Sequence, residues 1–308
     1  MAEQTLYSGV LPVYKPAGPT SHDVVHQARK MLGTKRIGHA GTLDPFAEGV
    51  LVLLIGEATR LQQFYMHHQK MYSGEITLGS GTDTDDRTGR VIIRLPVPDT
   101  ITSQCIQNTI HNALSGQILQ TPPQYSAVHV LGKRAYALAR SGEHISIPER
   151  IVHIFSFTVS FQEPDTVLFK VTCSAGTYIR SLARDLGKLL GTCAHLKSLV
   201  RDSTGVFTSD TAVRPDAISE KEILPAGFGL TLVGEIPLTQ EDTVMIKKGV
   251  YQHLLPKEAE GLYALVTHPS PDCNSELTAC PCNNYKNPLL IVHVHDGKKK
   301  IVFRSDTL

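Results

Sequence analysis

The sequence predicts an α+β protein, in which a large N-terminal part mixes helices and strands and a small C-terminal part is rich in strands. Segments with the apolar spacing of helices are interleaved with segments that alternate apolar and polar residues, as half-buried strands do. The chain has 308 residues, of which 41% are hydrophobic. This is enough for one large domain, or for one medium and one small domain.

The first predicted elements surround turns rich in glycine and proline. Residues 10–18 predict a short strand that ends in a Pro/Gly turn. Thr20, with Asp23 three residues later, has the pattern of a capping box, and the apolar residues that follow predict a helix that stops at Gly33. The apolar run 50–55, which comes after a segment with three glycines, predicts a buried strand.

The middle of the chain combines strand and helix patterns. We predict strands at 72–79, 151–161 and 167–174, helices at 103–115 and 177–190, an acidic loop at 79–89 and an extended Pro-rich segment at 121–127. In the last helix, Arg180, Arg184 and Lys188 recur at every fourth position and form one basic ridge, while Tyr178 and Leu189 share the apolar face. Spacing alone slightly favours a solvent-facing ridge over a contact with a phosphate or carboxylate.

The C-terminal part begins near residues 233–240, and we divide the chain into domains 1–235 and 236–308. The patterns predict a helix start at 238–242, strands at 261–266 and 289–295, an irregular loop at 268–288 and a lysine-rich turn at 297–300. The loop contains Cys273, Cys280 and Cys282, which with His268, His293 and His295 offer zinc ligands. Their spacing is not that of a standard zinc knuckle, so we predict no metal site.

Charge and cysteine content limit the class of protein. The formal net charge is +1, but the segment from Lys133 to Arg201 carries ten Lys and Arg against five Asp and Glu. This local excess favours a polyphosphate partner, and a solvated basic face is the alternative. Without an N-terminal apolar segment or a run near 18 apolar residues, we expect no signal peptide, no membrane contact and a cytoplasmic location. The six scattered cysteines fit ordinary thiols of a cytosolic protein.

The segment 36–51 has the strongest local signal for function. Its Asp44 lies between a Gly-rich turn and the predicted buried strand. A carboxylate in such a place has a fixed position and restricted access to water, which suits a nucleophile. An Asp-Pro pair after Gly-Thr-Leu is equally consistent with turn chemistry, so the residues alone leave both possibilities open.

Six motifs, in the same order, resemble those of the TruB family, the tRNA pseudouridine-55 synthases. They lie at 13–21, 36–51, 70–72, 81–89, 120–136 and 173–187. The second has the family pattern Gly-His-x-Gly-x-Leu-Asp-Pro-x-Ala-x-Gly-x-Leu. The resemblance covers about residues 8–216 and implies the pseudouridine synthase fold, with a mixed, largely antiparallel sheet and flanking helices. It also implies a small C-terminal PUA-like RNA-binding domain, although a convincing glycine signature for it is missing.

The resemblance implies that the protein isomerises uridine 55 in the T-loop of tRNA to pseudouridine. The glycosidic bond breaks, the base turns and C5 is joined to the ribose. Because no redox step or external energy is needed, we expect no cofactor. Asp44 is implied as the catalytic aspartate, which either attacks the nucleotide or removes the 2′ proton to form a glycal. Arg180 is implied as its partner and is expected to lower the pKa of the carboxyl, against the solvent-facing ridge that spacing favours.

Further roles follow from the resemblance. Tyr72 is implied as a catalytic residue that stacks on the uracil and takes or relays the C5 proton, with core packing as the alternative. Leu199 and Ile179 would form an apolar floor, and Tyr178 would pack and orient.

RNA contacts are implied outside the catalytic group. His39 would stack into the space that the flipped base leaves. Lys15, Lys133, Arg134 and Arg201 are candidates for phosphate contacts, although each alone is more often than not an ordinary surface charge.

The expected partner is the T-arm stem-loop of tRNA, bound by a monomer that needs no protein partner. An RNA chaperone that folds tRNA without catalysis is an alternative, but binding alone needs no buried carboxylate facing phosphates. A guide-RNA-dependent, dyskerin-like subunit is a third possibility. The lack of Lys-rich tails and of a clear PUA signature favours a stand-alone enzyme.

Overall fold

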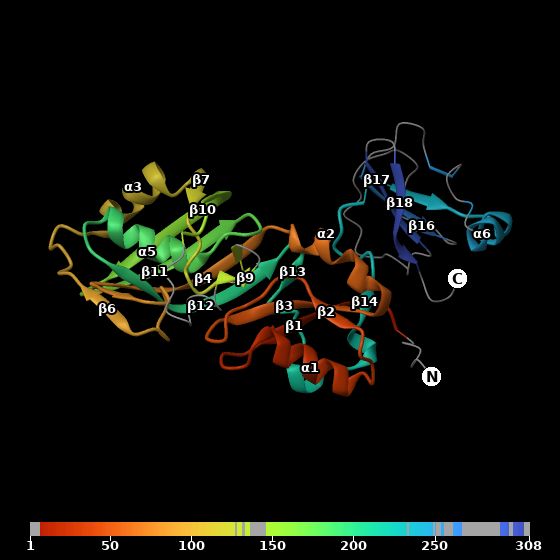
Figure 1. The fold of residues 1–308 in the computed structure, drawn as a ribbon, viewed down its shortest axis with the longest axis horizontal. Coiled ribbons are helices and arrows are strands. Elements are labelled where there is room, and N and C mark those ends of the chain that lie inside the picture. The colour runs from red at the N-terminus through yellow and green to blue at the C-terminus, as the bar shows by residue number, and fades with distance from the viewer. Residues whose placement is uncertain are drawn as a thin grey trace.

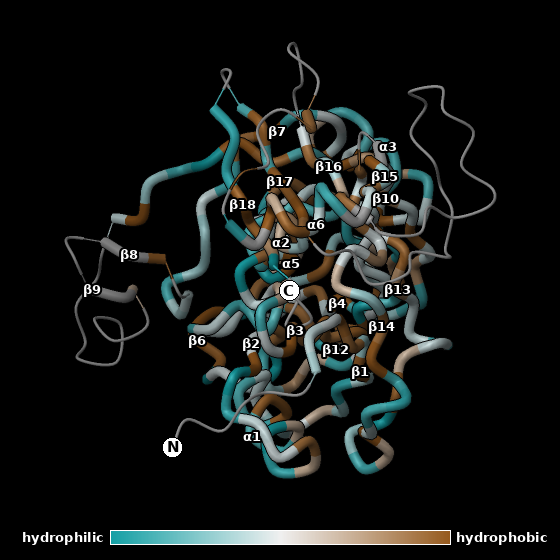
Figure 2. The backbone as a smooth tube through the Cα atoms, turned by 90° about the vertical axis from the view of Figure 1, so that its right-hand side faces the viewer, coloured by the Kyte–Doolittle hydropathy of each residue, from teal (hydrophilic) through white to brown (hydrophobic). Residues whose placement is uncertain are grey.

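Two sheets organise the protein in the computed structural model (Figure 1). The structure describes residues 7–126, 128–130, 133–135, 146–232, 234–248, 250, 254–255, 261–266, 290–295 and 298–304. A ten-stranded sheet with helices forms the larger part, and a four-stranded sheet forms the C-terminal part. Figure 2 shows hydrophobic stretches in the strands of both sheets.

The larger sheet has the order β14-β1-β3-β12-β4-β11-β10-β7, with β2 beside β3 and β13 beside β12. The strands are β1 (Gly9–Lys15), β2 (Ile37–His39), β3 (Glu48–Ile55), β4 (Lys70–Leu78), β7 (Gly116–Gln120), β10 (Arg150–Gln162), β11 (Thr166–Cys173), β12 (Ala194–Thr204), β13 (Phe207–Thr208) and β14 (Leu224–Pro225). Only β3 and β12 pair in parallel among these described strands, so the expected mixed, largely antiparallel sheet is confirmed.

Helices and small sheets surround this core. They are α1 (Ser21–Met31), η1 (Gly56–Leu61), α2 (Gln62–Met66), α3 (Ser103–Ala113), α5 (Ile179–Leu189), η2 (Pro215–Ala217), η3 (Glu220–Glu222), the pair β5 (Ser80–Thr82) and β6 (Val91–Arg94), and the pair β8 (His129–Val130) and β9 (Lys133–Arg134). Leu182 and Leu186 of α5 pack in one core with α3 and β4. Leu189, which we placed on the same face, is the last residue of the helix and is 49% exposed.

The N-terminal helix and strand form as the sequence predicts. Thr20 accepts a hydrogen bond from the Asp23 amide at 3.1 Å, and the Asp23 carboxylate accepts one from the Thr20 amide at 2.8 Å. This capping box satisfies backbone donors that the first turn leaves without intrahelical partners. The apolar run in β3 is buried throughout, which fixes the strand in the sheet interior.

Strand β12 lies between β3 and β4 at the centre of the sheet, and we did not predict it. Its pairing with β4 shifts register between Leu196 and Ser198 and again between Arg201 and Ser203. Each bulge interrupts the alternation of buried and exposed side chains, which is the signal by which a strand is recognised in a sequence.

The C-terminal sheet has the order β15-β16-β17-β18. Its elements are β15 (Gly234–Pro237), α6 (Gln240–Lys247), β16 (Gly261–Val266), β17 (Leu290–His295) and β18 (Lys298–Arg304). The predicted strands at 261–266 and 289–295 are confirmed, and a capping box at Thr239 starts the predicted helix. Lys298–Lys300 belong to β18 rather than to a turn, because their backbone pairs with β17. The segment 267–289 lies outside the described residues.

A shared core joins the two sheets. Ile291 and Phe303 from the C-terminal sheet pack in one buried cluster with Leu61 and Tyr65, which belong to η1 and α2. The Tyr65 hydroxyl donates to the Ala226 carbonyl at 2.6 Å. The C-terminal sheet therefore rests on an apolar surface just beyond β3. Among the described helices, none is long and apolar enough to cross a membrane.

Candidate active site

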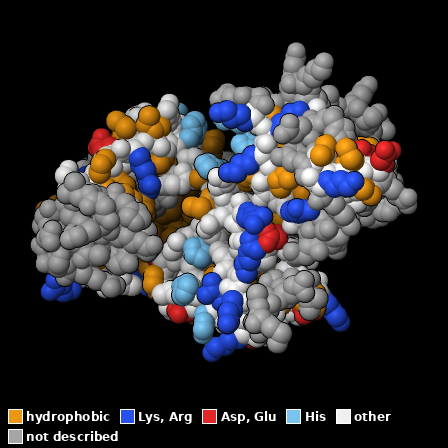
Figure 3. Space-filling model, turned by 45° about the vertical axis from the view of Figure 1, so that its right-hand side comes forward, with side chains coloured by type: hydrophobic (Ala, Val, Ile, Leu, Met, Phe, Trp, Pro, Cys, Tyr) orange, Lys and Arg blue, Asp and Glu red, His pale blue; other side chains and the backbone are white. Residues whose placement is uncertain are grey.

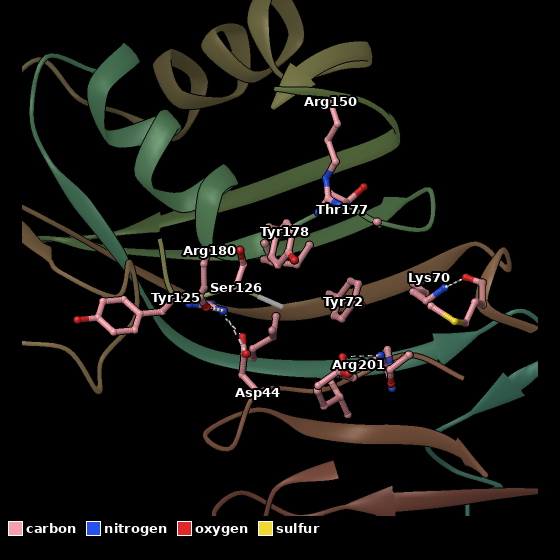
Figure 4. Close-up of a pocket in the computed structure, with 17 residues that line it drawn as sticks. Asp44, Lys70, Tyr72, Tyr125, Ser126, Arg150, Thr177, Tyr178, Arg180 and Arg201 are labelled. Atoms are coloured by element: carbon pink, nitrogen blue, oxygen red, sulfur yellow. Dashed lines mark hydrogen bonds and ion pairs between the residues drawn. The ribbon is translucent and has the colours of Figure 1, made fainter. Parts of the chain in front are cut away.

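A cavity of about 330 Å³ lies between the Asp44 loop, α5 and the strands β4 and β12 (Figure 4). This volume is in the range of small-molecule sites. Of the ten predicted site residues, the six that line the cavity are Asp44, Tyr72, Tyr178, Arg180, Leu199 and Arg201. Other residues of the lining are Gly41, Thr42, Leu43, Met66, Lys70, Tyr125, Ser126, Arg150, Gly176, Thr177 and Ile179.

The loop that carries Asp44 is held by the first turn of α1. The Ser21 hydroxyl donates to the Leu43 carbonyl at 3.0 Å, and its oxygen accepts from the Leu43 amide at 2.8 Å. These two bonds fix both backbone polar groups of Leu43, the residue next to Asp44. The motif at 13–21 thus supports the motif at 36–51 through direct hydrogen bonds.

Lys15 supports the same loop from beneath. Its fully buried ammonium donates to the carbonyls of Pro16 and Pro19 at 2.8 Å and to that of Pro45 at 3.2 Å. Burial lowers the pKa of Lys15 to about 8. The ammonium does not reach the surface, so the predicted phosphate contact is wrong for this residue.

Arg180 and Asp44 form a close ion pair, as the family resemblance implies. Nη2 of Arg180 donates to Oδ1 of Asp44 at 3.1 Å, and Nε lies 2.9 Å from Oδ2. The arginine also donates to the carbonyls of Thr84 and Tyr125 at 3.0 and 3.1 Å. Its side chain is 6% exposed, whereas that of Asp44 is 33% exposed. The solvent-facing ridge that spacing favours is therefore wrong at Arg180.

The pKa of the Asp44 carboxyl departs from our expectation. Burial raises this pKa above its ordinary value, and Arg180 acts in the opposite direction. The neighbouring Asp86 adds to the increase. We expected the guanidinium to dominate, but the loss of water around the carboxyl has the larger effect. A carboxylate with a raised pKa is a stronger base, which suits either catalytic route.

The acidic loop 79–89 positions the arginines of α5, a role that sequence reasoning missed. Buried Asp86 has Oδ2 at 3.6 Å from Nη1 of Arg180, and its Oδ1 accepts from the Thr88 amide at 2.9 Å. Asp85 accepts from Nη1 of Arg184 at 3.0 Å. The acidic loop and the basic ridge both lie in family motifs, so their complementary charge is a signal that could have joined them.

Tyr72 and Leu199 form the floor of the cavity. Both are buried, at 7% and 6% exposure, and they come from the adjacent strands β4 and β12. Figure 4 shows the Tyr72 ring facing the cavity. Burial raises the pKa of the Tyr72 hydroxyl, so the phenol keeps its proton at neutral pH.

Tyr178 is the N-cap residue of α5 and is clamped from two sides. The Gln120 side chain accepts from its amide at 2.8 Å and donates to its carbonyl at 3.0 Å. The Arg150 guanidinium lies over its ring, 4.3 Å from the centroid. Tyr178 thus packs as predicted and also lines the cavity. Sequence reasoning did not identify Arg150, which has no distinguishing local pattern at the start of β10.

Arg201 joins β12 to β3 and to the Asp44 loop. Its 1% exposed side chain donates to the carbonyls of Val50 at 2.6 Å and Gly41 at 3.1 Å. The parallel contact of β3 with β12 requires Gly49, which has a φ of +105°, because a Cβ there would collide with the Arg201 backbone. The Arg201 guanidinium is held by these backbone carbonyls beside the cavity, and its contact with a phosphate stays a prediction.

Among the described site residues, His39 and Lys15 are not part of the cavity lining. His39 ends β2, where its carbonyl accepts from the Gln62 side chain at 2.8 Å, and burial lowers the pKa of its imidazole. Lys133 and Arg134 form β9, and their side chains are outside the described part of the structure. Figure 3 shows Lys and Arg side chains in a band on one face, with histidines beside a hollow.

The described residues include no group of three or more His, Cys, Asp or Glu that could hold a metal ion. The cysteines and His268 of the predicted zinc alternative lie outside them. The two histidines that are described, His293 and His295, stack with ring centroids 6.0 Å apart on β17.

Comparison with known proteins gives a consistent result. The family described as TruB family pseudouridylate synthase (N terminal domain) matches residues 29–179. The tRNA pseudouridine synthase B of Streptococcus sanguinis is 38% identical over 265 residues, which cover 82% of this chain and 90% of that one. The Streptococcus agalactiae protein of the same name is 40% identical over 271 residues, with 84% and 92% covered.

A solved structure shares the fold. In the crystal structure of a Cbf5-Nop10-Gar1 complex, one chain matches with a TM-score of 0.64 and 24% identity. The match covers 96% of this chain and 85% of that chain. At this identity the likeness concerns the fold alone.

Proposed function

The chain belongs to the TruB family of pseudouridylate synthases, and on this premise we propose that it converts uridine 55 in the T-loop of tRNA to pseudouridine. One observation carries the proposal. The Asp44 carboxylate, paired with Arg180, faces a cavity whose floor is an aromatic ring and an aliphatic side chain. A base that leaves the T-loop needs such an apolar and aromatic surface next to the reacting group.

The reaction keeps all atoms of the nucleotide. Asp44 attacks C1′ or removes the 2′ proton, and the N1–C1′ bond breaks with its electron pair going to N1. The base then turns so that C5 faces C1′. The C5–C1′ bond forms as the Asp44–C1′ bond breaks in the first route, and as C2′ regains its proton from Asp44 in the second. C5 loses its proton and N1 gains one, so the product is an isomer and no redox partner takes part.

Three cavity residues besides Asp44 have a role in this reaction. Arg180 holds the carboxylate in its charged form and fixes its direction through two contacts. Tyr72 stacks on the freed uracil and relays the C5 proton, and its raised pKa keeps the phenol protonated for this exchange. Leu199 closes the floor with apolar surface, which lets the base turn without hydrogen bonds to break.

The partner is the T-arm of tRNA, bound by a single copy of the chain without another protein. His39, Lys133 and Arg134 are the proposed RNA contacts in domain 1–235. Domain 236–308 adds contacts beyond the stem-loop. The core that Phe303 shares with Tyr65 supports this arrangement, because it holds the C-terminal sheet against the part of the chain that carries the cavity.

The test uses an unmodified tRNA transcript, the pure protein and no cofactor, followed by mapping of pseudouridine along the RNA. We expect pseudouridine at position 55 with the wild type and none with Asp44→Asn, whose tRNA affinity should stay within a few-fold. Asp210→Asn, which removes an exposed carboxylate, is the matched control. Turnover by Asp44→Asn would remove Asp44 from the mechanism. Binding by the wild type without any pseudouridine would favour the chaperone alternative.

A further inference from the structure

Four cations line the cavity, and one of them differs from the others in its surroundings. Arg180 pairs with Asp44, Lys70 donates to the Met66 and His68 carbonyls at 2.9 and 2.7 Å, and Arg201 donates to carbonyls of β3 and the Asp44 loop. Arg150 has no carboxylate or carbonyl partner within the described ranges of the chain. Its guanidinium only lies over the Tyr178 ring.

An unpaired guanidinium in such a place is unfavourable for the free protein. Arg150 is partly buried, its Nε is buried without a hydrogen-bond partner, and burial lowers its pKa. Removing a charge from water without a partner costs free energy, so charged groups of this kind are normally paired or bind ligands. The contact with an aromatic face offsets only part of this cost.

The surroundings keep Arg150 accessible from the cavity and fixed in direction. Tyr178, beneath the guanidinium, is held by both hydrogen bonds to Gln120. Gly176 is beside it in a left-handed conformation with a φ of +84°, and a Cβ there would approach the guanidinium to 3.9 Å. Figure 4 shows Arg150 and Asp44 on opposite sides of the two tyrosines, Tyr72 and Tyr178.

We propose that Arg150 binds a backbone phosphate that flanks the target uridine. This inference rests on the proposed function, in which the target nucleotide enters the cavity. Uracil is neutral, but the flipped nucleotide carries a phosphate on each side, so it brings an anion along with the base. Arginine forks onto phosphate oxygens with two parallel bonds, which sets the direction of the sugar as well as its position. Arg150 is a positioning residue that places C1′ against Asp44.

The test combines a protein variant with a change in the RNA. A T-arm stem-loop is made with a neutral methylphosphonate at the phosphate 5′ or 3′ to the target uridine. Affinity and single-turnover rate are measured for wild type, Arg150→Gln, Arg150→Lys and Lys170→Gln on each RNA. Lys170→Gln is the matched control, since it removes one charge from an exposed position of β11 whose neighbours Phe169 and Val171 are buried on the opposite face.

We expect Arg150→Gln to lower the single-turnover rate divided by Kd about 10-fold to 100-fold on normal RNA, with Arg150→Lys intermediate and Lys170→Gln near wild type. One of the two methylphosphonates should reduce the same ratio for the wild type by a similar factor. On that RNA, Arg150→Gln should lose less than about threefold more, because both changes remove the same contact.

Two results would overturn the proposal. One is a wild type that tolerates both methylphosphonates without loss. The other is that Arg150→Gln reduces this ratio on both modified RNAs as much as it does on normal RNA. Arg150 would then act by holding Tyr178 in place rather than by binding a phosphate. Failure of the proposed function is a separate result, since wild type would then form no pseudouridine in the unmodified stem-loop. The affinity comparison still decides on the phosphate contact in that case, and a thermal melt of each variant excludes unfolding.

Discussion

Buried cations lie on two sides of the cavity, and their hydrogen-bond partners differ between the two sides. On the side that includes Lys15, Lys70 and Arg201, which we call the carbonyl wall, each cation donates to backbone carbonyls. On the side formed by α5 and the loop 79–89, the carboxylate wall, Arg180 and Arg184 face aspartates.

The two kinds of partner, carbonyls and carboxylates, suit two different functions. Carbonyl groups do not titrate near neutral pH, so the cations of the carbonyl wall fix the chain in one shape. Carboxylates do titrate, so Arg180 in the carboxylate wall affects the charge of Asp44, the group that we propose reacts. Asp44 connects the walls, because its loop is held by Lys15 while its carboxylate is held by Arg180.

Arg180→Lys should have the largest effect on activity. Lysine keeps the charge but loses the two-point contact with the Asp44 carboxylate. We expect the single-turnover rate to fall about 100-fold to 1,000-fold, or roughly 3–4 kcal/mol of transition-state stabilisation. Arg184→Lys, which does not contact Asp44, is the control and should lose less. A wild-type rate in Arg180→Lys would mean that the carboxylate wall only supports the fold.

Lys15→Met should mainly change stability. It leaves three carbonyls without the donor that the fully buried Lys15 supplies, which we expect to cost about 3 kcal/mol in the free energy of unfolding measured with denaturant. The affinity for tRNA should stay within about twofold. Unchanged stability, together with weaker binding and a shallower salt dependence, would instead assign Lys15 to a phosphate contact.

His68→Phe should remove an acid sensitivity next to the carbonyl wall. Burial lowers the pKa of His68 to about 4, below its ordinary value of 6.5, and the ring stacks on Phe207. The unfolded chain therefore binds the proton first, so this contribution is complete above pH 6.5 and is lost as the pH falls toward 4. We expect wild type to lose about 2 kcal/mol over this range.

The measurement compares thermal melts of both proteins at pH 7.5 and pH 5. Wild type should show the larger drop in Tm. An equal drop in His68→Phe would assign the acid sensitivity to other groups, such as those of the carboxylate wall.

Arg90→Ala should have the smallest effect and marks the edge of the carboxylate wall. Arg90 is 92% exposed and lies 3.5 Å from Asp83 in the same loop that contains the buried Asp86. Exposed pairs contribute little, so we expect a change within about 0.5 kcal/mol in denaturant melts and an unchanged rate. A large loss would show that the loop is held from its surface rather than from its buried aspartates.

Helix starts and buried strands that depend on residues close together in the chain were predicted from the sequence. The capping boxes at Thr20 and Thr239 and the apolar run of β3 all determine structure within a few residues. The pairing of Asp44 with Arg180 came from the family resemblance, since helix spacing alone favoured a solvated ridge.

The carbonyl wall could not be predicted in this way. Lysine and arginine are rarely buried, and what buries them here comes from distant parts of the chain. Lys15 reaches the Pro45 carbonyl 30 positions away, and Arg201 reaches that of Val50 151 positions away. Such contacts depend on the finished sheet, and the bulges of β12 hide the strand that brings Arg201 there.

The strand order also determines when β3 can pair with all its partner strands as the chain is synthesised. β3 pairs with β1 along one edge and with β2 at Leu53–Ile55 of the other edge. The start of that other edge, at Glu48 and Gly49, pairs with β12, which ends at Thr204. At about 5–20 residues per second, the ribosome needs roughly 10–30 s to make the segment between them. During this interval the start of β3, next to its apolar run, lacks its partner strand on this edge, and an unpaired edge invites association with other nascent chains. The reacting pair, 136 positions apart, therefore forms only near the end of this vulnerable period.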